Sequence, residues 1–178
     1  MGSDADTSVG RNYGGSSSSS SSNGGGSGGY SSGYAATAAG MAEYANSRVG
    51  YSKSQLGLDG YNEWCAKFVE HCATAVGYMT YNLNYLTDST RGLRPYQSSN
   101  ILKGFTTYIK NSVGLGHWAI IWNKTSSSIT TIEGNTSEYV GIDKNRVNVI
   151  VYFWNSSNQR YMRSDNTGVY LESYLINS

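Results

Sequence analysis

The spacing of hydrophobic positions predicts two helices in the first half of the chain. From Asn62 to Gly77, apolar residues recur every three or four positions, which places them on one face of a helix. We expect Asn62 to cap this helix and Gly77 to end it. An earlier stretch, Ala35 to Arg48, is rich in good helix formers, and Gly50 follows it. The shared face of the 62–77 helix is formed by Cys65, Phe68, Val69, Cys72, Ala73 and Val76.

After Gly116 the hydrophobic period changes to two, which is typical of strands. His117–Trp122 and Ile129–Glu133 are predicted to form a hairpin, and Val147–Trp154 is predicted to be a third strand. The remaining predicted strands are 160–163 and 168–176.

Residues 78–112 show no clear period. Segment 91–95 is interpreted as a loop, and 96–110 as a segment that includes a short helix. Helices followed by an antiparallel meander indicate an α+β domain.

The first 33 residues differ in composition from the rest of the chain. Ser and Gly dominate residues 14–33, and such a segment buries too little apolar surface to offset its ordering entropy. We therefore divide the chain into a disordered Ser/Gly-rich linker or tail, 1–33, and a globular domain, 34–178. A linker predicts tethering to upstream domains of a longer protein, whereas a tail has no partner; both interpretations stay open.

Charge and hydropathy narrow the class of protein. The formal net charge is +1, which argues against a nucleic-acid binder, because phosphate recognition usually needs a basic excess. No apolar run approaches the ~20 residues that a membrane span needs, so no span is expected. The segment Met1–Asp6 has neither a basic stretch nor an apolar core, so no signal peptide is expected in this chain.

The two cysteines, Cys65 and Cys72, are expected to be free thiols. They lie seven residues apart in one predicted helix, so their Cα atoms would be about 10 Å apart, too far for a disulfide. Two cysteines and two histidines also lack zinc-ligand spacing. We expect neither a metal nor another cofactor.

Cys65 is the candidate nucleophile. A thiol is weakly nucleophilic until it loses its proton, and the first turn of a helix favours the thiolate through unpaired N–H groups and the helix dipole. Cys65 is predicted to lie in such a turn. Cys72 lies in the middle of the helix and fits a small core residue better.

His117 is the candidate partner of the thiol. It starts a strand, alternates with Ala119, and is expected to face a helix packed on the sheet as general base or ion-pair partner. Glu133 ends the partner strand and is expected to orient His117, while the amide of Asn135 could support the site. His71 is interpreted as structural, and most of the aromatic residues as core, with a few left to line a cleft.

Three blocks carry these residues in order: Trp64-Cys65-Ala66-Lys67-Phe68-Val69, Gly116-His117-Trp118-Ala119-Ile120-Ile121 and Ile132-Glu133-Gly134-Asn135. Together they resemble the signature of CHAP domains, the cysteine- and histidine-dependent amidohydrolases/peptidases. The resemblance covers roughly residues 35–155. The Asp-Cys-Ser-Gly usual in the related NlpC/P60 family is absent, and 58–63 holds no convincing run of calcium ligands.

The resemblance implies a papain-like, NlpC/P60-related α+β fold, with N-terminal helices packed on an antiparallel β-sheet, and makes 34–178 a CHAP-like catalytic domain. It implies that Cys65 is the nucleophile and His117 the base, that Glu133 orients His117, and that Asn135 assists.

The activity implied is that of a peptidoglycan hydrolase. Such an enzyme cleaves a muramoyl-alanine amide, or a stem or cross-bridge peptide bond, through a thioester. The family occurs in phage endolysins, tail-associated lysins and secreted autolysins. An extracellular or cell-wall location, or one in a phage virion or lysis protein, is therefore expected. Two rival hypotheses stay open: a non-catalytic wall-binding module of the same fold, and a cysteine peptidase or amidase toxin that acts on another amide.

Overall fold

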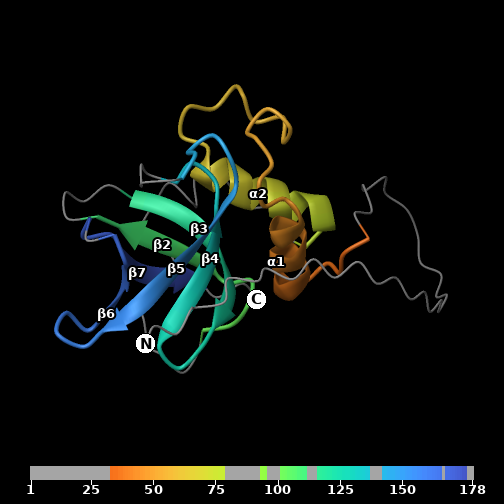
Figure 1. Cartoon of the computed structure of the whole chain (residues 1–178). Coiled ribbons are helices and arrows are strands. Elements are labelled where there is room, and N and C mark those ends of the chain that lie inside the picture. Colours follow the sequence, from red (N-terminus) through yellow and green to blue (C-terminus); the bar gives the residue numbers. More distant parts are fainter. Residues whose placement is uncertain are drawn as a thin grey trace, which may run out of the picture.

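The structure is a computed structural model that describes residues 33–78, 93–95, 101–111, 116–136, 142–165 and 167–175. The predicted Ser/Gly-rich segment lies outside these ranges, apart from Gly33. The described residues form two helices and seven strands (Figure 1). The helices are α1 (Ala38–Ser47) and α2 (Cys65–Val76), and the strands are β1 (Leu93–Pro95), β2 (Thr106–Lys110), β3 (Gly116–Lys124), β4 (Ser128–Glu133), β5 (Asn148–Asn155), β6 (Arg160–Arg163) and β7 (Tyr170–Leu175).

Six of the strands close into an antiparallel β-barrel. Strands β2 to β6 pair with their neighbours in chain order, and β7 pairs with β2. The barrel closes where Met162 of β6 pairs with Tyr170 of β7, and β1 adds to β7 from outside. The expected papain-like α+β fold, with helices packed on an open antiparallel sheet, is therefore wrong. Alternation of apolar and polar residues indicates that the two faces of a strand have different surroundings. It does not reveal whether the first and last strands of the sheet pair with each other to close a barrel.

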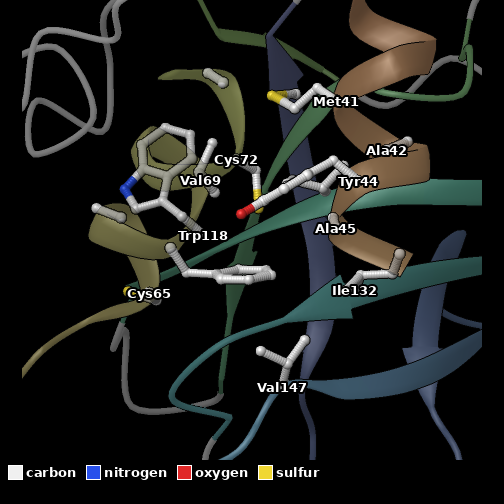
Figure 2. Packing of buried hydrophobic residues seen from close by; sticks show 14 of the residues in the cluster. Met41, Ala42, Tyr44, Ala45, Cys65, Val69, Cys72, Trp118, Ile132 and Val147 are labelled. Atoms are coloured by element: carbon white, nitrogen blue, oxygen red, sulfur yellow. The ribbon is translucent and has the colours of Figure 1, made fainter. Parts of the chain in front are cut away.

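The barrel interior is one of two hydrophobic cores. One cluster takes buried side chains from all six barrel strands, such as Ala119 and Ile121 of β3 and Leu171 of β7. The other lies between the barrel wall and the two helices, and it takes Trp118 and Ile120 of β3 (Figure 2). Successive residues of β3 therefore point alternately into the two cores, as the alternation of side chains along a strand requires.

Both helices begin later than the sequence pattern predicts. Thr37 caps α1, and its hydroxyl accepts a hydrogen bond of 3.0 Å from the backbone N–H of Gly40. Asn62 was expected to cap α2, but Trp64 precedes its first residue and makes no side-chain cap bond. The chain bends at residues 62 and 63, and the Trp64 indole that follows is buried, 1% exposed, with its ring edge-on to Phe68. The predicted end of α2 is confirmed: Gly77 caps it in the left-handed conformation, at φ 67°.

Two of the strands were missed. Thr106–Lys110 is β2, not part of a short helix, and 93–95 forms β1 where a loop was expected. Thr106 through Ile109 are all buried, so β2 shows no alternation of apolar and polar residues. Residues 96–100 lie outside the described residues.

The five strands predicted after residue 116 are present, with ends within two residues of those expected. They follow the period-two pattern because each of them has one face inside the barrel. Among the described residues, no helix is both long and apolar enough to cross a membrane.

Candidate active site

Cys65 is the first residue of α2, and its side chain is buried. Because Trp64 supplies no side-chain cap, the first N–H groups of the helix stay available. The backbone N–H groups of Ala66 and Trp118 hydrogen-bond to the sulfur, and so does the imidazole of His117. Burial alone would raise the pKa of the thiol, but His117 and these two N–H groups outweigh it and lower the pKa. The thiolate is therefore favoured.

His117 lies near the start of β3, between Cys65 and Glu133. Its Nε2 is 3.0 Å from Oε2 of Glu133, which leaves Nδ1 as the ring nitrogen for Cys65. As expected, His117 meets a helix, because its imidazole hydrogen-bonds Cys65 at the start of α2. It lies on the same face of β3 as Ala119, which belongs to the barrel interior, so the contact is made at the end of the barrel.

Glu133 is the most buried of the three residues Cys65, His117 and Glu133, at 0% exposed. Its Oε2 contacts His117, while its Oε1 accepts hydrogen bonds from the hydroxyls of Thr131, at 2.6 Å, and Tyr152, at 2.8 Å. Burial alone would raise the pKa of this carboxyl, but His117 and the two hydroxyls outweigh it and lower the pKa. Glu133 is therefore held as a carboxylate inside the barrel.

The pKa of His117 completes the electrostatic description. Burial alone would lower it, but the interactions with Cys65 and Glu133 raise it to about 10. A thiolate, an imidazolium and a carboxylate thus lie in a row, each stabilising the charge of the next. This is the state in which a cysteine attacks a carbonyl without an external base.

Asn135 does not join this row. Its Nδ2 donates a hydrogen bond of 3.0 Å to Oε2 of Glu63, two residues before the nucleophile. Its backbone has φ 59°, a left-handed conformation that is uncommon outside glycine. The structure thus brings three of the four predicted site residues together and places the fourth on the cleft wall, as a link between 133–135 and 63–65.

A cleft of about 620 Å³ opens over these residues. Cys65 and His117 line it, with Glu63 and Asn135 on one part of the wall and Lys110 on another. The volume lies within the range of about 300–1,000 Å³ typical of ligand sites. The nucleophile is therefore accessible to a substrate, although its side chain is largely covered by protein.

Sequence reasoning missed Thr131, Tyr152 and Glu63. Thr131 had a usable signal, because residues two apart on a strand share a face, and Thr131 precedes Glu133 by two. Tyr152 reaches Glu133 only through the pairing of β4 with β5, and Glu63 reaches Asn135 only through the tertiary fold.

The other cysteine and histidine lie apart from the cleft. Cys72 is fully buried in the helix-side core, and burial raises the pKa of its thiol well above the usual value. His71 Nε2 lies 3.1 Å from the hydroxyl of Tyr44. Both cysteines are free thiols, as predicted. Within the described ranges, no group of three His, Cys, Asp or Glu residues is arranged to hold a metal ion.

The chain matches no family model, no curated protein and no solved structure.

Proposed function

We propose that this protein is a cysteine-dependent hydrolase that cleaves amide bonds in peptidoglycan. The observation that carries the chemistry is the row of Cys65, His117 and Glu133, in which the thiol pKa is lowered and the imidazole pKa is raised. A thiolate at a helix N-terminus, beside an imidazolium that a buried carboxylate orients, is suited to acyl transfer.

The proposed reaction runs in two steps. The Cys65 thiolate attacks the amide carbonyl carbon, and backbone N–H groups at the start of α2 stabilise the oxyanion. His117 gives its proton to the leaving nitrogen, the C–N bond breaks, and a thioester remains. Water then gives a proton to His117 as its oxygen attacks the thioester. The C–S bond breaks, which releases the acid and restores the thiolate–imidazolium pair.

The choice of substrate rests on the resemblance of three ordered blocks to CHAP domains, not on the barrel. Those blocks hold Cys65, His117 and Glu133, the same residues that the fold brings together. The cleft leaves room beside the thiol for a peptide, and its wall carries both charged and aromatic groups, including Glu63, Lys110 and Tyr108. A peptide with several polar groups fits such a wall better than a purely apolar ligand does.

Release of new amines from purified cell walls tests this proposal. We expect wild-type protein to release amines and to lower wall turbidity, and Cys65→Ala to do neither. Cys72→Ala is the matched control, because it removes the other thiol without touching the cleft, and we expect it to stay active. Mass spectrometry of the fragments identifies the bond. Equal release by Cys65→Ala and wild type would exclude the mechanism, and intact walls after wild-type treatment would exclude the substrate.

A further inference from the structure

A second hollow, of about 580 Å³, is lined by residues of α1, of α2 and of the segment that joins the two helices. Leu56 and Leu58 give it an apolar floor, and Tyr61 and His71 line its sides. Its size lies in the range of small-ligand sites. Neither Cys65 nor His117 lines it, so the proposed chemistry does not use it.

The charged groups of this hollow already have partners. Lys67 Nζ lies 3.0 Å from Oε2 of Glu70, and the guanidinium of Arg48 lies over the Tyr44 ring, 4.5 Å from its centroid. Arg48 also donates a hydrogen bond of 3.1 Å to the hydroxyl of Tyr51. Lys67 and Glu70 neutralise each other, whereas the tyrosine partners of Arg48 hold its guanidinium in place without carrying an opposite charge.

What the hollow offers a ligand is an aromatic face with polar groups beside it. The Tyr61 side chain is 42% exposed, and Lys67 Nζ, 4.8 Å from its ring centroid, helps to hold the ring in place. His71 presents an imidazole, and burial together with the charge of Arg48 lowers its pKa. Its Nε2 lies 3.1 Å from the hydroxyl of Tyr44, so Nδ1 is the ring nitrogen left for a ligand. A sugar ring, with an apolar C–H face and a rim of hydroxyls, has complementary chemistry.

The two hollows lie next to each other along the chain. Ala66 lines the cleft and Lys67 lines the second hollow, so the first turn of α2 borders both. From Tyr61 and Lys67 the second hollow extends along α2 to Thr74, a distance of about 10 Å from Lys67 at the rise of a helix. The two hollows therefore lie on either side of the first turn of α2.

We propose that the second hollow binds a sugar ring of the glycan strand whose attached peptide enters the catalytic cleft. This deepens the proposed function and rests on it for the identity of the polymer. Sugar binding at the Tyr61 face is nevertheless measurable without catalysis, because it depends on stacking and hydrogen bonds alone.

The test is a titration of the full-length Cys65→Ala variant with a β-1,4-linked tetramer of N-acetylglucosamine, followed by NMR. We expect saturable shifts at Tyr61 and His71. Replacing Tyr61 by Ala in that background should weaken binding at least tenfold, whereas Tyr61→Phe keeps the ring and should retain the affinity. Phe153→Ala, which removes a 50%-exposed aromatic ring on β5, is the matched control and should bind like its parent.

Absence of saturable binding, or equal affinity in the Tyr61→Ala variant, would overturn the proposal. Displacement of the sugar by inorganic phosphate would also overturn it, because that outcome indicates an anion site. The variant used in the titration lacks the nucleophile, so the result does not depend on wall cleavage. Sugar binding without amine release by the wild type would contradict the proposed hydrolase and leave the sugar site standing.

Discussion

Cys65 and Cys72 lie on the same helix, but their thiols are in opposite electrostatic environments. Burial acts on both thiols to raise the pKa, yet only Cys65 meets an imidazole and two backbone N–H groups, those of Ala66 and Trp118. The position of Cys65 in the first turn could be predicted from the hydrophobic pattern. The hydroxyls of Thr131 and Tyr152 on the buried carboxylate could not, because the pairing of β4 with β5 brings Tyr152 to Glu133.

The first prediction concerns the pH dependence of hydrolysis. The thiolate persists above the lowered pKa of Cys65, and the imidazolium persists below the pKa of His117, about 10. Activity should therefore be bell-shaped, with its acid limb below the usual cysteine value of 9 and its alkaline limb near 10. In Glu133→Gln the alkaline limb should move to lower pH, because the charge that stabilises the imidazolium is lost. If the pH–activity profile of Glu133→Gln were the same as that of the wild type, Glu133 would have no part in stabilising the imidazolium.

The second prediction concerns the hydroxyl of Tyr152. Tyr152→Phe removes one of the donors to a fully buried carboxylate, and we expect the free energy of unfolding to fall by about 1–3 kcal/mol. The pKa of Glu133 should rise as well, because a hydrogen bond to its charged form is lost. Urea unfolding measures the first effect. Tyr170→Phe, whose hydroxyl contacts Glu172 in a less buried position, is the control and should change stability by less than about 0.5 kcal/mol.

The third prediction concerns the hydrogen bond between Glu63 and Asn135. Because it links the segment before the nucleophile to the segment after Glu133, Glu63→Ala should lower kcat more than it raises KM. Glu63→Gln keeps an oxygen acceptor for Asn135 and should restore most of kcat. If the Ala and Gln variants had the same kcat, the hydrogen bond would have no part in positioning Cys65.

At the scale of elements, the approach of α2 to the end of β4 is set by one glycine. A Cβ atom on Gly134 would lie 2.5 Å from the Trp64 ring and 2.9 Å from Cβ of Phe68. The buried indole of Trp64 therefore packs directly against this glycine, just before the first residue of α2. The sequence pattern predicts both helices and the strands β3 to β7, but not β2, which shows no alternation because Thr106 to Ile109 are all buried.

The fourth prediction follows from this contact. Gly134→Ala should lower the free energy of unfolding by about 1–3 kcal/mol through overpacking. It should also reduce activity, because Trp64 and Glu133 adjoin the substituted region. Gly60→Ala is the matched control, since nothing lies within 4 Å of the added Cβ. Chemical denaturation of both variants measures the difference, and equal stability would show that α2 and β4 are less tightly packed than described.

At the scale of the whole molecule, the closed barrel is the feature that the sequence did not reveal. Its closing contact joins β6 to β7, and the backbone N–H of Arg163 donates a hydrogen bond of 2.9 Å to the carbonyl of Val169 across that seam. Period-two patterns are the same for an open sheet and a barrel, so they could not reveal the closure even for the strands that they predicted correctly. Glu133 hydrogen-bonds to Tyr152, whose side chain belongs to the core inside this barrel.

The fifth prediction tests the closure by hydrogen exchange. The Arg163 amide should exchange about as slowly as the amides of β3, because it is bonded within a closed ring. An open sheet would leave β6 as an edge strand. Fast exchange at Arg163, with slow exchange in β3, would contradict the barrel.

The measurement that tests the central claim most directly is the pH dependence of alkylation of Cys65 by iodoacetamide, with the modified residue identified by mass spectrometry. We predict that the midpoint of its pH–rate curve lies below the usual cysteine value of 9, and that His117→Ala moves this midpoint to higher pH. Cys72, in the same sample, should remain almost unmodified because it is fully buried. A Cys65 rate that rises steadily through pH 9, and that is unchanged in His117→Ala, would contradict the thiolate–imidazolium pair on which the proposed hydrolase depends.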